Sequence, residues 1–99
     1  MLFRSEKFEQ AAALGSFRAC IALSDLHRSA KRHDQAVAAA ARAKAMAEQS
    51  SDARWALVVA LRAKGARELA TLECHAALAE VPGTARFVTA LNELHNRQP

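Results

Sequence analysis

The chain has 99 residues and a mass of 10.7 kDa, enough for one small domain. Apolar residues make up 52% of it, about half of them alanine, and there are 3 Gly, 2 Pro and no Tyr. This composition disfavours a β-rich fold and a disordered chain. The formal charge of +4 comes from 14 basic and 10 acidic residues, a bias too mild and too dispersed to indicate nucleic-acid binding. We therefore expect one all-helical domain.

The sequence also bears on compartment and redox state. Its longest apolar run, from Trp55 to Leu61, is far shorter than the roughly 20 residues that span a bilayer, so no membrane association is expected. The first residues contain no apolar stretch of signal-peptide length, which favours a cytoplasmic location. Cys20 and Cys74 lack the short spacing of metal-binding pairs, and in a reducing compartment both are expected to be buried, unpaired thiols.

Apolar residues in the first half of the chain recur at intervals of three and four, which predicts three amphipathic helices. The first covers residues 5–14 and ends at Gly15. The second covers residues 17–30, with Ser16 in the N-cap position. The third covers residues 33–49, an alanine-rich stretch of high helix propensity in which charged residues keep one face polar.

Three more helices are predicted in the second half. A capping cluster at residues 50–52 begins the first of them, and Gly65 supplies the turn that ends it. The next stops before Pro82, because proline cannot continue the helical hydrogen bonds, and Thr84 caps the last. These helices cover residues 52–64, 67–80 and 85–96. The links between all six are short, so consecutive helices are expected to lie antiparallel.

A weak internal repeat has a period of 34 residues. Leu23, Leu57 and Leu91 are spaced by this period, and so are several alanines. The positions resemble the tetratricopeptide repeat, a 34-residue helix-turn-helix that opens with an aromatic residue, Leu and Gly, carries Ala-x3-Phe in its second helix and closes with Pro. The matches are Cys20-x2-Leu23-Ser24-x2-His27 and Ala36-x3-Ala40 in the first unit, Leu57, Gly65, Ala70-x3-Cys74 and Pro82 in the second, and Val88-x2-Leu91-Asn92-x2-His95 in a third.

The resemblance implies about two and a half stacked helical hairpins in a short right-handed superhelix of about six helices, forming one domain over residues 1–99. Its parts are an N-terminal capping helix at 1–15, repeats at 17–50 and 51–84, and a C-terminal capping helix at 85–97. In the second repeat Val58 stands where the family has a glycine that lets the paired helices touch. This hairpin is therefore expected to pack more widely.

No group of residues favours catalysis or a cofactor. Cys74 and His75 are neighbours on a helix, where adjacent side chains diverge by about 100°, so we do not expect them to act as a nucleophile and its base. The three glycines are isolated, so no phosphate-binding loop is predicted. His27 and His95 stand at equivalent repeat positions and are expected to be half-buried packing residues. We therefore expect a protein that is not an enzyme and binds no metal or other cofactor.

Binding to another protein is the favoured function. In tetratricopeptide arrays the first helix of each pair lines a concave groove, and the resemblance implies three partner-binding stripes at spacing i, i+4, i+7. They are Ile21, Asp25 and Arg28, then Trp55, Val59 and Arg62, then Thr89, Glu93 and Asn96. Tryptophan and arginine are frequent at interface hot spots, and Arg28 and Arg62 indicate an acidic contact on the partner. Trp55 also fits a core position, because Leu57, Val58 and Leu61 make its helix apolar nearly all round.

We therefore expect a module that binds a helix or extended segment of a partner protein, in part an acidic one. Three other hypotheses fit the same sequence: a small cytoplasmic secretion-type chaperone, a tetratricopeptide-like fragment of a bacterial transcription regulator, and a self-associating helical bundle such as a homodimer. A plain alanine-rich bundle without a groove is a further alternative.

Overall fold

The computed structural model describes residues 16–96, and within this part of the chain it contains five α-helices and no strand. The helices are α2 (Phe17–Ser29), α3 (His33–Met46), α4 (Ser51–Lys64), α5 (Arg67–Glu80) and α6 (Ala85–Asn96). The all-helical prediction is confirmed. The helix predicted at residues 5–14, and with it the capping helix at 1–15, lies outside the described residues. None of the described helices is long and apolar enough to cross a membrane.

Ser16, Ser50 and Gly65 cap their helices as the sequence predicts, whereas the hydroxyl of Thr84, the predicted cap of α6, donates to the Val81 carbonyl at 2.8 Å. The Ser16 hydroxyl accepts a hydrogen bond from the Ala19 N–H at 3.2 Å, and α4 begins in the same way from Ser50, which accepts from Ala53 at 3.3 Å. Gly65 ends α4 with φ of +89°, the left-handed conformation that glycine adopts without strain. Helices α2, α4 and α5 therefore start or stop within one residue of their predicted bounds.

Helix α3 ends at Met46, earlier than the predicted end at residue 49. The reason is the cap of the next helix. Ser50 needs an extended backbone (φ −81°, ψ 118°) to cap α4, and its N–H donates to the Ala47 carbonyl at 2.9 Å. Arg54 Nε donates to the Glu48 carbonyl at 2.8 Å and holds the turn. The chain must leave the helix before residue 49 to make this reversal.

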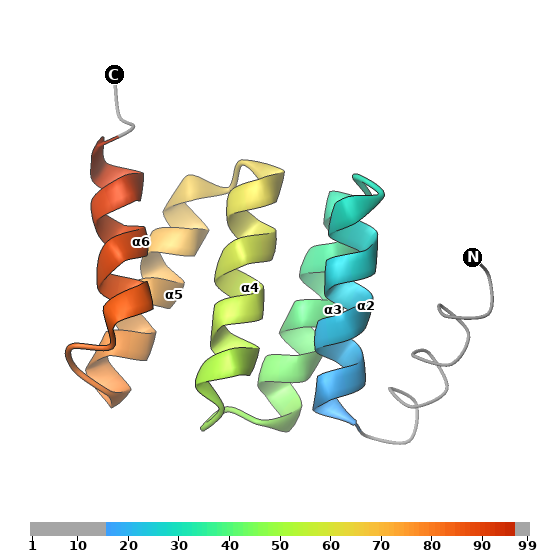
Figure 1. Cartoon of the computed structure of the whole chain (residues 1–99), viewed down its shortest axis with the longest axis horizontal. Helices are drawn as coiled ribbons and strands as arrows, with labels where there is room; N and C mark the ends of the chain where they lie inside the picture. The colour runs from blue at the N-terminus through green and yellow to red at the C-terminus, as the bar shows by residue number, and fades with distance from the viewer. Residues whose placement is uncertain (1–15, 97–99) are drawn as a thin grey trace.

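The helices form two layers (Figure 1). Helices α2, α4 and α6 lie side by side in one layer, and α3 and α5 lie behind them. Each helix contacts the next along the chain, and α2 also contacts α4 directly. The described chain is thus a row of antiparallel hairpins, with every second helix in the same layer.

The core between the layers is built mainly from small side chains. One cluster joins α2, α3 and the start of α4; the other extends from α3 to α6 and contains Phe87, the largest fully buried side chain. Cys20 and Cys74 are both buried free thiols, as predicted.

The two hairpins differ in how closely their helices pack. Ser24 is buried in α2 and donates its hydroxyl to the Ala36 carbonyl of α3 at 2.8 Å, so these helices touch. In α4 the equivalent residue is Val58, which is fully buried. The backbones of α2 and α3 come close at more positions than those of α4 and α5, in agreement with the wider second hairpin expected from Val58.

The turn between α2 and α3 generates a stability prediction. Lys31 is the one non-glycine residue with positive φ, +62°, among the described residues. A side chain costs about 1 kcal/mol in this conformation. Lys31→Gly is therefore expected to raise the free energy of unfolding by about 0.5–1 kcal/mol, measured by urea denaturation.

Gly65→Ala is the matched opposite change. A Cβ at Gly65 would meet no atom within 4 Å, so backbone strain alone should lower the free energy of unfolding, by about 1 kcal/mol. An unchanged or lowered stability of Lys31→Gly, beside a destabilised Gly65→Ala, would show that the Lys31 turn is not strained.

Candidate functional site

The open side of α4 coincides with the stripe predicted on it. Helix α4 lies in the middle of the row, and six of its residues are buried: Ala53, Ala56, Leu57, Val58, Ala60 and Leu61. Trp55, Val59 and Arg62 are half-buried and recur at i, i+4, i+7. Between the exposed residues at the two ends of α4, solvent reaches this stripe and Arg54.

Trp55 is shared between the core and the surface. Its ring meets the Phe87 ring edge to face, with centroids 5.6 Å apart and an interplanar angle of 80°. The Arg86 guanidinium lies 5.5 Å from the centroid of the Trp55 ring and 5.6 Å from that of Phe87. The sequence is compatible with Trp55 in the groove or in the core. In the structure one side of Trp55 packs on the larger core cluster, and the residue is half-buried.

The stripe on α2 combines an apolar and a charged part. Ile21 is half-buried and packs against both core clusters. Asp25 is exposed and pairs with Arg28 one turn further along, at 3.4 Å between Oδ1 and Nη2. The charge of Arg28 is therefore compensated within its own helix.

The stripes of α4 and α6 are joined by an ion pair. Arg62 Nη2 lies 2.9 Å from Glu93 Oε1. Thr89 is exposed on α6, and the Asn96 side chain lies outside the described part of the structure. Arg62, like Arg28, thus has an acidic partner in the same chain, which reduces the positive charge that both present to a ligand.

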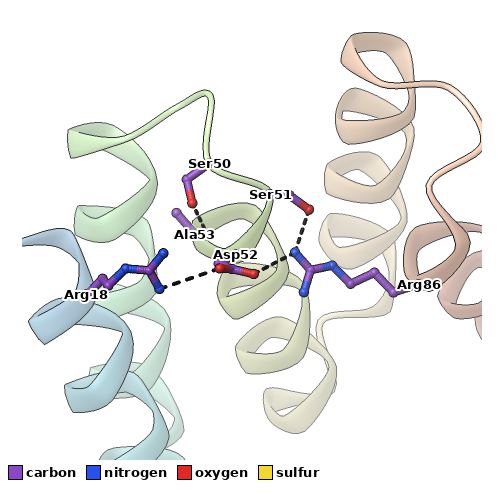
Figure 2. A network of polar contacts seen from close by, with 6 residues as sticks. All are labelled: Arg18, Ser50, Ser51, Asp52, Ala53 and Arg86. Carbon is purple, nitrogen blue, oxygen red and sulfur yellow. Dashed lines mark hydrogen bonds and ion pairs between the residues drawn. The ribbon is translucent and has the colours of Figure 1, made fainter.

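A second cluster, absent from the predicted stripes, lies at the N-terminal end of α4 (Figure 2). Asp52 Oδ1 accepts a hydrogen bond from Arg86 Nη2 of α6 at 3.0 Å, and its Oδ2 lies 3.6 Å from Arg18 Nη1 of α2. Arg86 Nη2 also donates to the Ser51 hydroxyl. One carboxylate therefore links all three helices of the front layer.

The sequence contained a signal for this cluster. Arg18, Asp52 and Arg86 follow one another at intervals of 34 residues, so they occupy the same position of the repeat. A basic, an acidic and a basic residue at equivalent positions predict ion pairs between neighbouring units, provided that equivalent helices lie side by side. Arg18, Asp52 and Arg86 each lie three residues before the first member of a predicted stripe, so the i, i+4, i+7 spacing does not include them.

Charge also sets the protonation state of this cluster. The hydrogen bond from Arg86, and then its charge, hold the pKa of Asp52 below its usual value of 3.8, and the charge of Arg18 acts in the same direction. Asp52 is therefore ionised at neutral pH. In α5, burial raises the pKa of the Cys74 thiol, against the opposing charge of Arg62, so this thiol stays protonated and unreactive.

A pocket of about 140 Å³ opens near the same end, lined by residues that include Arg54, Glu80 and Phe87. Its volume suits one side chain of a ligand. Arg54 is only 12% exposed and is held by the Glu48 carbonyl and by Glu80, 3.6 Å away. Its charge is thus already paired inside the chain.

The two histidines at equivalent repeat positions differ in exposure. His27 is half-buried, as expected, and its Nδ1 accepts a hydrogen bond from Arg32 Nε at 3.0 Å. His95, expected to pack like it, is exposed instead, because α6 is the last described helix and none of the described helices covers that side. Within residues 16–96 no three His, Cys, Asp or Glu side chains are grouped to hold a metal ion.

Comparison with known protein families finds no matching family model, and comparison with curated proteins finds no similar sequence. A function for this chain is therefore inferred from its own residues.

The ion pairs of Asp52 generate a pH prediction. A carboxyl whose pKa is lower in the folded chain stabilises the fold above its unfolded-state pKa, and this stabilisation is lost as the pH falls through the folded-state pKa. Between about pH 5 and pH 2, the wild type should lose stability more steeply than Asp52→Asn, by urea denaturation at each pH.

Asp34 provides the internal reference. The pKa of Asp34 is also lowered, by a hydrogen bond from Lys64 and by the charge of that lysine. Its contribution to the pH dependence of stability is the same in the wild type and in Asp52→Asn, so it cancels when the two are compared. Because Asp52 is exposed, the difference should be small and should shrink in high salt. Parallel stability profiles at low salt would mean that the two arginines do not favour the ionised carboxylate in solution.

Proposed function

We propose that the chain is a tetratricopeptide-like array, a short right-handed superhelix, that binds a segment of another protein and catalyses no reaction. The observation that carries this proposal is the spatial meeting of residues 34 positions apart, Arg18 with Asp52 and Asp52 with Arg86. Side-by-side packing of equivalent helices is what stacked repeats of this length produce. It supports the repeat independently of sequence identity.

The proposed binding surface is the α2–α4–α6 face, defined by the residues of these helices that lie away from α3 and α5. Its members are Arg18, Ile21, Asp25 and Arg28 of α2, Asp52, Trp55, Val59 and Arg62 of α4, and Arg86, Thr89 and Glu93 of α6. Half-buried apolar side chains run through its middle at Ile21, Trp55 and Val59, and ion pairs flank them. An apolar centre with a charged rim is the usual anatomy of a protein-binding surface.

The ligand that suits this face is a helix or an extended segment. Either one can lay apolar side chains along the row from Ile21 to Trp55 while its polar groups meet the flanking charges. A secretion-type chaperone or a fragment of a transcription regulator would use the face in the same way, with a different partner.

Self-association is a second candidate, favoured by a specific observation. Leu69 and Leu72 on α5 are 55% and 63% exposed and lie one helical turn apart, outside the α2–α4–α6 face. Exposed leucines that adjoin on a helix are typical of surfaces that pair with another chain. The two candidates thus use different surfaces and can be separated by substitution.

The test compares three baits in affinity capture from a lysate of the source organism: wild type, Val59→Glu and Leu72→Glu. Val59 is half-buried on the open side of α4, so glutamate there adds a charge to the centre of the face without entering the core. We expect one protein to be retained by wild type and by Leu72→Glu and lost by Val59→Glu. A segment of it should then bind Val59→Glu at least about tenfold more weakly in titration.

Circular dichroism of each bait checks that it is folded, and sedimentation gives its oligomeric state. Equal capture by Val59→Glu and wild type would overturn the proposed face. A wild-type dimer that Leu72→Glu converts to a monomer, with no protein lost by Val59→Glu, would assign the chain to self-association instead.

A further inference from the structure

The charges of the α2–α4–α6 face balance at one end and not at the other. Arg28 is matched by Asp25, and Arg62 by Glu93. At the N-terminal end of α4, by contrast, Arg18 and Arg86 share the single carboxylate of Asp52 (Figure 2). We call Arg18 and Arg86 the arginine pair. Among residues 16–96, it carries one positive charge more than the single carboxylate that it shares.

Both members of the arginine pair have hydrogen-bond donors to spare. Arg18 lies 3.6 Å from Asp52, beyond hydrogen-bonding distance, and its side chain is 70% exposed. Arg86 makes its bonds to Asp52 and Ser51 through one nitrogen, Nη2, and its side chain is 33% exposed. A guanidinium offers five donors in a planar fork that matches a carboxylate.

Arg86 is also held in place before any ligand arrives. Its guanidinium lies over the rings of Trp55 and Phe87, and its bonds to Ser51 and Asp52 fix the direction of Nη2. Less rotational freedom is then lost on binding. The side chain of Arg18 lies on the other flank of Asp52 and is 70% exposed (Figure 2).

We propose that the arginine pair is the acid-recognition subsite of the α2–α4–α6 face and binds an aspartate or glutamate carboxylate of the partner segment. This inference rests on the proposed function and places the acidic contact at the N-terminal end of α4, away from Arg28 and Arg62. One carboxylate matches the one surplus charge. A phosphate dianion would leave negative charge facing Asp52, so the structure favours an acidic protein segment.

The probe is the peptide acetyl-Leu-Glu-Glu-Leu-amide, titrated at low ionic strength. Trp55 is the only tryptophan in the chain and lies beneath Arg86, so the NMR signal of its indole N–H reports on this subsite. We expect saturable shifts with this peptide and none with its glutamine counterpart.

Four variants separate a subsite from general attraction. Arg18→Gln, Arg86→Gln and the control Arg62→Gln each remove one positive charge, and Arg62 resembles Arg86 in exposure, 25% against 33%, and in having an acidic partner. We expect Arg18→Gln and Arg86→Gln to weaken binding about three- to tenfold, and Arg62→Gln less than about twofold. Asp52→Asn removes the internal competitor and should strengthen binding, an effect that loss of folding cannot imitate.

Several outcomes would overturn the subsite. These are no saturable shift with the wild type, equal weakening by all three arginine variants, or weaker binding by Asp52→Asn. Tighter binding of a short oligothymidylate than of the peptide would assign the arginine pair to phosphate instead. If the peptide does not bind, the capture experiment with Val59→Glu still tests the proposed function, because that variant does not change the arginine pair. If the peptide binds but no protein is captured, the proposed binding of a partner segment is wrong and the carboxylate subsite remains.

Discussion

Alanine at the contacts between helices is the constraint on which this structure depends. Six alanines are completely buried: Ala36, Ala40, Ala43, Ala53, Ala60 and Ala70. Each contributes little on burial, about 0.8 kcal/mol per methyl group, so no hairpin gains enough from its own apolar face. Small side chains do let helices approach closely, and each helix from α2 to α5 then contacts two or more neighbours. The stacking in two layers follows from this, and it gives α4 its single open side.

That stacking decides which charges meet. Lys44 of α3 bonds both oxygens of Glu73 of α5, at 2.8 and 2.9 Å, across the rear layer, just as Asp52 spans the front one. The solvent-exposed pairs of Asp52 add little to stability. Their larger effect is on recognition, since a charge that is paired inside the chain attracts a ligand less. The charge that the face presents to a partner is what this pairing leaves over, and in the described part of the chain it lies at Arg18 and Arg86.

Local signals explain where prediction succeeded and where it stopped. Ser16, Ser50 and Gly65 act within a few residues of themselves, so the helix bounds that they set could be predicted. The early end of α3 depends on Arg54, which reaches back to the Glu48 carbonyl from the following helix, and no local pattern contains that bond. The stripe on α4 came from the resemblance to the tetratricopeptide repeat, and the apolar residues around Trp55 left the place of this residue open between groove and core.

The sequence by itself determined the five described helices to within a few residues, their antiparallel order and the burial of both cysteines, because these follow from periodicity and capping along a short stretch of chain. Only the tertiary structure decided the role of Trp55, half in the core against Phe87, and the pairing of Arg62 with Glu93. It also decided that Arg18 and Arg86 share Asp52. Each of these depends on the distance between helices far apart in the chain, which packing sets and sequence spacing does not.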